Sequence, residues 1–142
     1  MSLDRQERIS WLTGVPLFAS CDKDTIERIA DTTGELSFAD GQAIVQQGQV
    51  GNGLYIVVSG AVRIVAGASE LARLGPGDFF GELAVIDQQP RNATAYADGP
   101  TDCLALASWD LIALLERDSG LAMNLLRELA RRLRRADAQL RH

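Results

Sequence analysis

The chain has 142 residues, a hydrophobic content of 46% and a formal net charge of −5 at pH 7. This length and composition predict one globular domain with a buried core and exclude a disordered chain. The negative net charge argues against nucleic-acid binding by the whole chain, and the apolar runs are too short for a membrane-spanning helix.

Histidine and cysteine limit the possible chemistry. The single histidine is His142, at the last position, which argues against histidine-based catalysis. Cys21 and Cys103 lack the spacing of a metal or redox motif, so we expect free thiols in a reducing compartment. No signal peptide opens the sequence. We therefore expect a cytoplasmic protein.

Residues 4–32 are predicted to be helical, with a break at residues 14–18, whose sequence is GVPLF. Ile26 and Ile29 lie on one side of a modest amphipathic helix between Asp22 and Asp31. The first part of the chain is therefore expected to supply helices that pack on the rest.

The pattern changes between about residues 35 and 107. Short β-branched runs such as LYIVVSG and AVRIVAG alternate with turn residues, and nine of the 13 glycines lie between Gly41 and Gly81. Regular short strands with turn signals predict an antiparallel sandwich or barrel. The Gly-Pro-Gly sequence at residues 75–77 predicts a tight turn.

Helical periodicity returns from residue 108 to about residue 141, with Ser108 and Ser119 as candidate N-caps of two helices. In the second helix, apolar residues recur as in a heptad seam. The seam consists of Ala122, Leu126, Leu129, Leu133, Ala136 and Leu140. Either this seam binds a partner helix while Leu121 and Leu125 pack on the barrel, or all of these residues form one wide core-facing stripe.

The segment FGELAVIDQQPRNATA, residues 80–95, holds the candidate binding site. Gly81 permits close backbone approach, and GELAVID suits one or two helical turns whose N-terminal amides favour an anion. Arg91 offers a planar fork for phosphate oxygens, and Glu82 can accept hydrogen bonds from sugar hydroxyls. These residues predict a nucleotide that carries a single phosphate charge. Alternatively, Glu82 and Arg91 pair with each other as a partly buried salt bridge.

This segment resembles the phosphate-binding cassette of cyclic nucleotide-binding domains. That cassette reads Phe-Gly-Glu-Leu-Ala, a loop, then Pro-Arg, a small residue, Ala and Thr; this chain has FGELA at residues 80–84 and PRNAT at residues 90–94. The runs LFASCDKDTIERIA, GLYIVVSGAVRI and LGPGDFFGE extend the resemblance over roughly residues 12–141.

The resemblance implies a single domain over residues 1–142 of the α+β class, mainly β. An antiparallel jelly-roll β-barrel would span residues 35–107, between N-terminal helices at 4–32 and C-terminal helices at 108–141, the last of which is a lid helix. Such a domain would bind cyclic AMP or cyclic GMP as a regulatory sensor module. It would not be an enzyme and would need no cofactor or metal.

The resemblance also assigns the ligand contacts. Arg91 would hold the cyclic phosphate together with the amides of Leu83 and Ala84, and Glu82 would hold the ribose 2′-hydroxyl. The expected set is completed by Gly81, by Asn92 and Ala93 beside the phosphate, by Ile64, Leu71 and Leu74 on the apolar wall, and by Arg132, Ala136 and Asp137 on the lid.

The last helix resembles the central helix of the catabolite activator family, where it forms a parallel dimer seam. We therefore expect a homodimer through Leu126, Leu129, Leu133 and Leu140. Arg132 would support Glu82 or the phosphate, or would lie solvated on a charged face. The family's DNA-reading helix-turn-helix would follow this helix, whereas the sequence stops at His142. We expect no DNA binding by this chain alone, and either no output module or a piece of a longer transcription factor, channel or other regulated protein.

The chain departs from the family pattern near the base. Asn92 stands where the family usually has Ala, Ser or Thr, and Ala136 and Asp137 stand where catabolite activators place a hydroxyl pair against adenine. A carboxylate aimed at the base would favour guanine, which offers two neighbouring donors. Arg134 and Arg141 can pair with Asp137 at helical spacing, so we predict that Asp137 faces solvent and that cyclic AMP is preferred.

Two other functions compete with a sensor. A cupin-type enzyme would need several inward His or Glu ligands for a metal, which this sequence does not supply. A dimerisation module would keep the fold and lose the site, and the retained Glu82 and Arg91 argue against it.

Overall fold

Eight strands form the centre of the protein, which a computed structural model describes over residues 2–50, 53–81 and 89–140, with the backbone alone for 136–140. In chain order the strands are Gly34–Phe38 (β1), Ala43–Val45 (β2), Gly53–Ser59 (β3), Val62–Ala66 (β4), Ser69–Leu74 (β5), Phe79–Phe80 (β6), Thr94–Ala97 (β7) and Thr101–Ala107 (β8). They form two four-stranded antiparallel sheets, with the orders β1-β8-β3-β6 and β2-β7-β4-β5.

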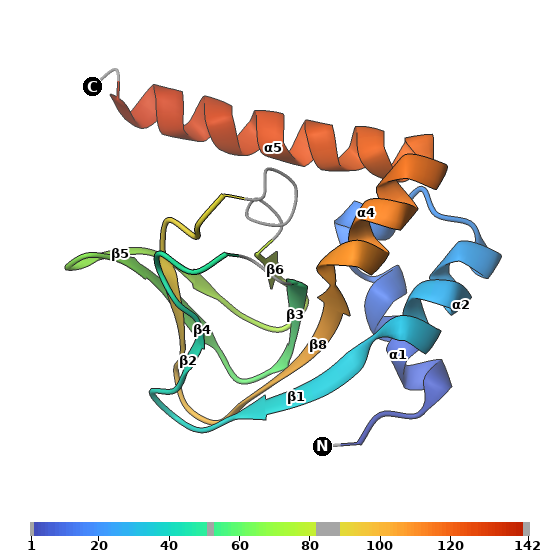
Figure 1. Ribbon diagram of the computed structural model, residues 1–142, viewed down its shortest axis with the longest axis horizontal. Helices are drawn as coiled ribbons and strands as arrows, with labels where there is room; N and C mark the ends of the chain where they lie inside the picture. The colour runs from blue at the N-terminus through green and yellow to red at the C-terminus, as the bar shows by residue number, and fades with distance from the viewer. Residues whose placement is uncertain (1, 51–52, 82–88, 141–142) are drawn as a thin grey trace.

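Helices flank the sheets at both ends of the chain. They are Arg5–Thr13 (α1), the 3-10 turn Pro16–Phe18 (η1), Lys23–Thr32 (α2), Ser108–Arg117 (α4) and Ser119–Leu140 (α5). Figure 1 shows α1 and α2 on one side of the sheets and α5 crossing above them. The architecture confirms the predicted α+β, mainly β class and its jelly-roll arrangement of antiparallel strands. Closure into a barrel and the extent of the domain stay predictions.

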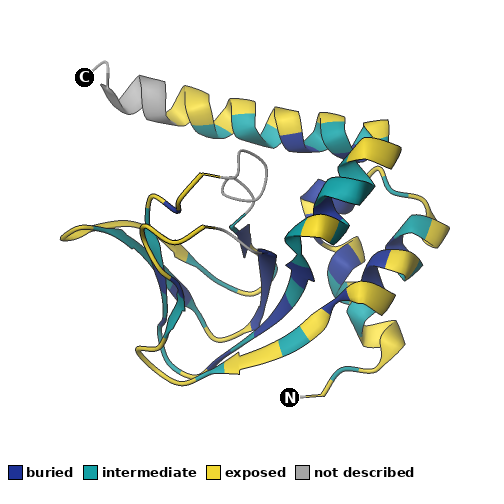
Figure 2. Ribbon diagram, in the orientation of Figure 1, coloured by how far each residue is buried: buried dark blue, intermediate teal, exposed yellow. Residues whose placement is uncertain are grey.

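The side chains of β3 enter two different cores, because successive residues of a strand point to opposite faces. Leu54, Ile56 and Val58 pack in a cluster between the first sheet and the helices, whereas Tyr55 and Val57 pack in a cluster between the two sheets. This explains why β3 reads as a continuous apolar run rather than an alternating one. Figure 2 shows the buried residues concentrated along β3, β8 and the facing helices.

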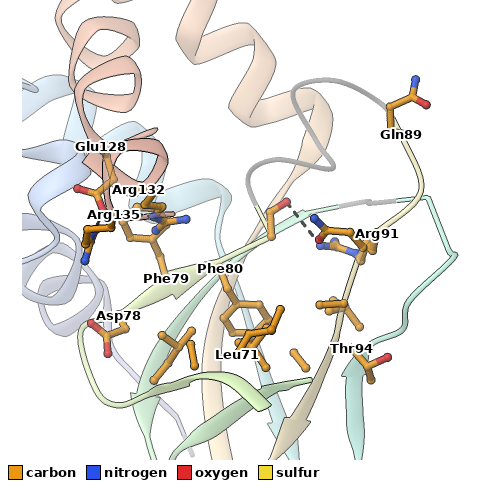
Figure 3. Close-up of a pocket in the computed structure, with 18 of the residues that line it drawn as sticks. Leu71, Asp78, Phe79, Phe80, Gln89, Arg91, Thr94, Glu128, Arg132 and Arg135 are labelled. Carbon is orange, nitrogen blue, oxygen red and sulfur yellow. Dashed lines mark hydrogen bonds and ion pairs between the residues drawn. The ribbon is translucent and has the colours of Figure 1, made fainter. Parts of the chain in front are cut away.

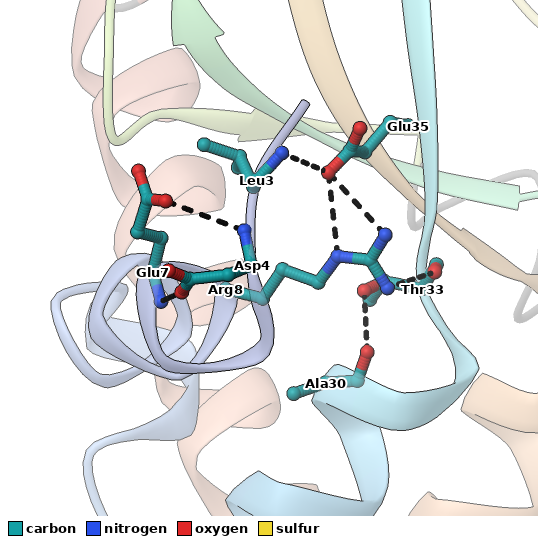
Figure 4. A network of polar contacts seen from close by, with 7 residues as sticks. All are labelled: Leu3, Asp4, Glu7, Arg8, Ala30, Thr33 and Glu35. Atoms are coloured by element: carbon teal, nitrogen blue, oxygen red, sulfur yellow. Dashed lines mark hydrogen bonds and ion pairs between the residues drawn. The ribbon is translucent and has the colours of Figure 1, made fainter. Parts of the chain in front are cut away.

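A polar network holds α1 against β1 (Figure 4). Asp4 caps α1 through a capping box with Glu7. Arg8 Nη2 lies 3.3 Å from Oε1 of Glu35 on β1, and the backbone N–H of Leu3 donates to the same oxygen at 2.6 Å. The carboxylate of Glu35 therefore joins the start of the chain to the sheet.

The structure corrects both predicted N-caps of the C-terminal helices. α4 begins at Ser108 itself, and Ala107 occupies the N-cap position without a side-chain hydrogen bond. At the start of α5, Oδ1 of Asp118 accepts a hydrogen bond from the backbone N–H of Leu121 at 3.0 Å. Aspartate caps a helix as well as serine does. Asp118, rather than Ser119, therefore caps α5. Among the described helices, none has both the length and the apolar character needed to cross a membrane.

Candidate ligand-binding site

Gly81 stands where β6 ends, at a position that only glycine fits. Its φ is +98°, and a Cβ added there would lie 2.7 Å from the carbonyl oxygen of Gly53 and 3.1 Å from Nη1 of Arg91. The tight turn predicted at residues 75–77 leads into β6, with Gly77 at φ +92° and the N–H of Asp78 donating to the carbonyl of Gly75 at 3.0 Å. The close approach predicted at Gly81 is therefore an approach between two segments of this chain.

Arg91 is a buried cation, with only 8% of its surface exposed. Its backbone N–H donates to the carbonyl of Gln49 at 2.7 Å, which fixes the chain at this point. Its side chain donates from Nη2 to the carbonyl of Gly53 at 3.2 Å. It also donates from Nη1 to the carbonyl of Gly81 at 3.5 Å (Figure 3). These two contacts orient the guanidinium at the end of β6.

An aromatic pair supports this corner of the site. The rings of Tyr55 and Phe80 stack with their centroids 5.3 Å apart. Burial raises the pKa of the Tyr55 phenol, and the positive charge of Arg91 acts in the opposite direction. Tyr55 and Arg91 are both buried, so they share one weakly solvated environment.

A cavity of about 960 Å³ lies beside Arg91, between the sheets and α5. The structure brings eight of the predicted site residues together around it. They are Ile64, Leu71, Leu74, Gly81, Arg91, Asn92, Ala93 and Arg132. Ile64 and Leu74 also pack against the core between the sheets, and Leu71 is 59% exposed. The wall is thus apolar over much of its area, and a contact of these residues with a ligand stays a prediction.

Arg132 reaches the cavity from α5. Its guanidinium lies over the ring of Phe79, 5.0 Å from the ring centroid, and its Nε lies 3.3 Å from Oε1 of Glu128 (Figure 3). The side chain is 36% exposed, so it lies at the rim rather than fully in solvent. Arg132 was expected either to support Glu82 or the phosphate or to lie solvated on a charged face. Its position at the rim of the cavity favours the first interpretation.

Several predicted residues lie outside the described residues. Glu82, Leu83 and Ala84 belong to this group, as does the short helix expected from GELAVID. The alternative salt bridge between Glu82 and Arg91 is therefore open. Ala136 and Asp137 lie in α5, whose backbone is described there without their side chains.

Sequence reasoning missed five charged or aromatic residues of the cavity: Asp78, Phe79, Phe80, Glu128 and Arg135. Glu128 and Arg135 lie four residues before and three residues after Arg132, which places all three on one helix face. That spacing was readable in the sequence. Which face turns toward the cavity depends on how α5 crosses the sheets.

The described thiols and acidic groups can be compared with the requirements of a metal or nucleophilic site. In the part of the chain that the structure describes, no three His, Cys, Asp or Glu side chains gather closely enough to hold a metal ion. Burial raises the pKa of Cys103 to about 12 and that of Cys21 to about 11. Both thiols are therefore protonated and weakly nucleophilic at neutral pH.

Comparison with known proteins gives a family and a curated relative. The family model for the cyclic nucleotide-binding domain matches residues 35–118. A cyclic AMP receptor protein of Thermus thermophilus is 39% identical over 134 residues, which cover 91% of this chain and 62% of the relative. The chain thus spans about three-fifths of the length of that relative.

Solved structures agree with this match. The crystal structure of Thermus thermophilus catabolite activator protein matches with a TM-score of 0.79 at 39% identity. The match covers 88% of this chain and 61% of the catabolite activator protein chain. The regulatory domain of Toxoplasma gondii PKA, crystallised with cAMP, matches with a TM-score of 0.78 at 29% identity. This match covers 90% of this chain and 50% of the Toxoplasma gondii chain. The chain therefore belongs to the family of cyclic nucleotide-binding domains, and it is a regulatory domain of that family rather than an enzyme.

Proposed function

We propose that the domain binds one cyclic nucleotide monophosphate in the cavity beside Arg91 and acts as a sensor module, with cyclic AMP preferred over cyclic GMP. The observation that carries the proposal is Arg91 itself. The residue is 8% exposed, its guanidinium donates hydrogen bonds to the carbonyls of Gly53 and Gly81, and it borders a cavity of about 960 Å³. A buried cation in a cavity of this size suits a small ligand with one negative charge.

The apolar wall and the lid supply the other contacts. Ile64, Leu71 and Leu74 would pack against the base and sugar, and Asn92 and Ala93 would lie beside the phosphate. Glu82, with the amides of Leu83 and Ala84, keeps the roles implied by the family cassette. We infer the preference for cyclic AMP from the expected pairing of Asp137 with arginines of α5, which would leave an apolar site for adenine.

We further propose that the two sheets close into a barrel. We also propose that α5 responds to the ligand by moving or by dimerising. Leu126 and Leu133 are 60% and 70% exposed. Two large apolar side chains one heptad apart on an exposed helix face support a seam between two copies. The alternative is a dimerisation module that binds no cyclic nucleotide. The sensor would serve a cytoplasmic regulated protein such as a transcription factor or a channel.

Calorimetric titration with cyclic AMP and cyclic GMP tests the proposal. We expect saturable binding of both, tighter for cyclic AMP. Arg91→Ala should weaken cyclic AMP binding by about 2–5 kcal/mol, because a buried anion loses its charged partner. Arg91→Lys should recover part of this loss, because an ammonium keeps the charge without the fork.

The matched control is Arg28→Ala, on the exposed face of α2, which should bind like the parent. Circular dichroism should show that each variant is folded. Cyclic AMP binding of Arg91→Ala at parental affinity would refute the phosphate assignment. An absence of binding to both nucleotides in the parent would favour the dimerisation module.

A further inference from the structure

Glu128 binds three arginines of α5 at once. Its Oε2 lies 3.0 Å from Nη1 of Arg131, and its Oε1 lies 3.3 Å from Nε of Arg132 and 3.8 Å from Nη2 of Arg135. Its side chain is 22% exposed, whereas those of Arg131 and Arg135 are 64% and 69% exposed. The carboxylate is thus the least exposed member of the cluster.

The cluster belongs to the cavity wall. Glu128, Arg132 and Arg135 line the same cavity as Arg91 (Figure 3). Among the described lining residues the carboxylates are Asp78 and Glu128. Asp78 accepts a hydrogen bond from the backbone N–H of Gly75 at 2.9 Å and belongs to the turn before β6. Glu128 is therefore the described carboxylate that α5 contributes to the cavity, beside Arg132 and Arg135 of the same helix.

We propose that Glu128 sets the charge selectivity of the cavity, admitting a ligand with one negative charge and discriminating against a ligand with two. The inference rests on the proposed function, because it concerns the same site. Glu128 repels an anion in the cavity and also compensates the charges of Arg132 and Arg135. Both effects grow in proportion to the charge of the ligand.

The two relevant ligands differ in charge and share the base and sugar. A cyclic phosphodiester carries one negative charge at neutral pH. An open 5′-monophosphate has a second ionisation near pH 6 and carries close to two. Without the carboxylate of Glu128, the guanidinium groups of Arg91, Arg132 and Arg135, which line the cavity, would favour the dianion more than the monoanion. The carboxylate thus disfavours the binding of linear nucleotides to a cyclic-nucleotide sensor.

Glu128→Gln tests the proposal, because glutamine keeps the shape of the side chain and removes its charge. We expect cyclic AMP to bind about threefold tighter and 5′-AMP about tenfold tighter than to the parent, since the effect scales with ligand charge. The quantity to compare is the ratio of the two dissociation constants in each protein. Differences of shape between the two nucleotides cancel in that comparison.

The matched control is Glu116→Gln, which removes a carboxylate from the exposed surface of α4 and should leave the ratio unchanged. Glutamate–arginine pairs at this spacing also occur as ordinary surface pairs of a helix. In that case Glu128→Gln would change thermal stability and leave the ratio at the parental value, which would overturn the proposal. Equal gains for both nucleotides, or weaker binding of both, would overturn it too.

Failure of the proposed function can be told apart from failure of this inference. A parent that binds neither nucleotide contradicts the proposed function. Pyrophosphate at low ionic strength then serves as the anionic probe of the same arginines. Tighter pyrophosphate binding by Glu128→Gln than by the parent and by Glu116→Gln supports the role of Glu128, and no difference between the three proteins overturns it.

Discussion

Gly81 and Arg91 depend on each other at the residue scale. The carbonyl of Gly81 accepts a hydrogen bond from the Arg91 guanidinium, and the missing side chain of Gly81 leaves the space in which that guanidinium lies. The positive φ of Gly81 turns the chain as it leaves β6. A glycine in the cassette is therefore required by the protein's own packing, before any ligand is considered.

Gly81→Ala should destabilise the fold and the site together. A left-handed φ strains an alanine by about 1–3 kcal/mol. The new Cβ would also meet the Gly53 carbonyl at 2.7 Å and Nη1 of Arg91 at 3.1 Å. We expect a lower free energy of unfolding in urea and, at temperatures where the variant is folded, about tenfold weaker cyclic AMP binding, because Arg91 is displaced.

Gly67→Ala provides the comparison for this prediction. Gly67 also has a positive φ, +60°, but a Cβ there would meet no atom within 4 Å. This variant should lose about 1 kcal/mol of stability from backbone strain and should bind like the parent. If Gly81→Ala also binds like the parent, the contact of Gly81 with Arg91 does not position the guanidinium.

At the scale of elements, α5 has a buried apolar face and an exposed apolar face. The heptad pattern in the sequence combines residues from both. Leu129 was predicted to lie in the dimer seam, but it packs against the core between the helices and the first sheet. Leu126 and Leu133 are exposed, and Met123 joins them at 47% exposure. Leu121 and Leu125 are buried, as the second strip predicted. The exposed face is therefore narrower than the predicted seam.

Leu126→Arg combined with Leu133→Asp should separate assembly from folding. These side chains are exposed in the single chain, so charges there should leave the fold intact and prevent a helix–helix seam. Sedimentation velocity should show a dimer for the parent and a folded monomer for the double variant. A parent that sediments as a monomer at high concentration, with and without cyclic AMP, would contradict the seam.

Leu129→Ala is the matched control for the double variant. Because Leu129 packs against the core, its truncation should lower the free energy of unfolding by about 1–3 kcal/mol. It should leave the dimer mass unchanged at temperatures where the variant is folded. If the Leu129→Ala variant dissociates into monomers, Leu129 contributes to the dimer seam.

At the scale of the whole molecule, sequence periodicity predicted the order of the elements but not their mutual placement. The change from helical to strand patterning gave the boundaries near residues 35 and 107, and the apolar run of β3 is explained by its two buried faces. The packing of Leu129 and the approach of Glu128 to the cavity depend on the crossing of α5 over the sheets. Spacing within one helix does not determine that crossing.

The packing between the sheets predicts a loss of stability at alkaline pH. Cys103 is fully buried there, and burial raises its pKa from 9.0 to about 12. Above about pH 9 the unfolded chain loses this proton while the folded chain keeps it. The thiol therefore stabilises the fold fully below pH 9, and this contribution is lost as the pH rises toward 12.

Cys103→Ala should flatten the alkaline loss of stability. Between about pH 9 and about pH 10 the buried thiol accounts for a loss of about 1 kcal/mol in the free energy of unfolding, which a protein with alanine at this position cannot show. Urea denaturation of each protein at both pH values measures the change in its free energy of unfolding between them. Other groups ionise alike in parent and variant, so they do not affect the comparison of the two changes. The small cavity left by alanine lowers stability at both pH values alike and does not enter the comparison. Parallel losses in the two proteins would mean that Cys103 ionises as readily in the folded chain as in the unfolded one, and that water reaches the core between the sheets.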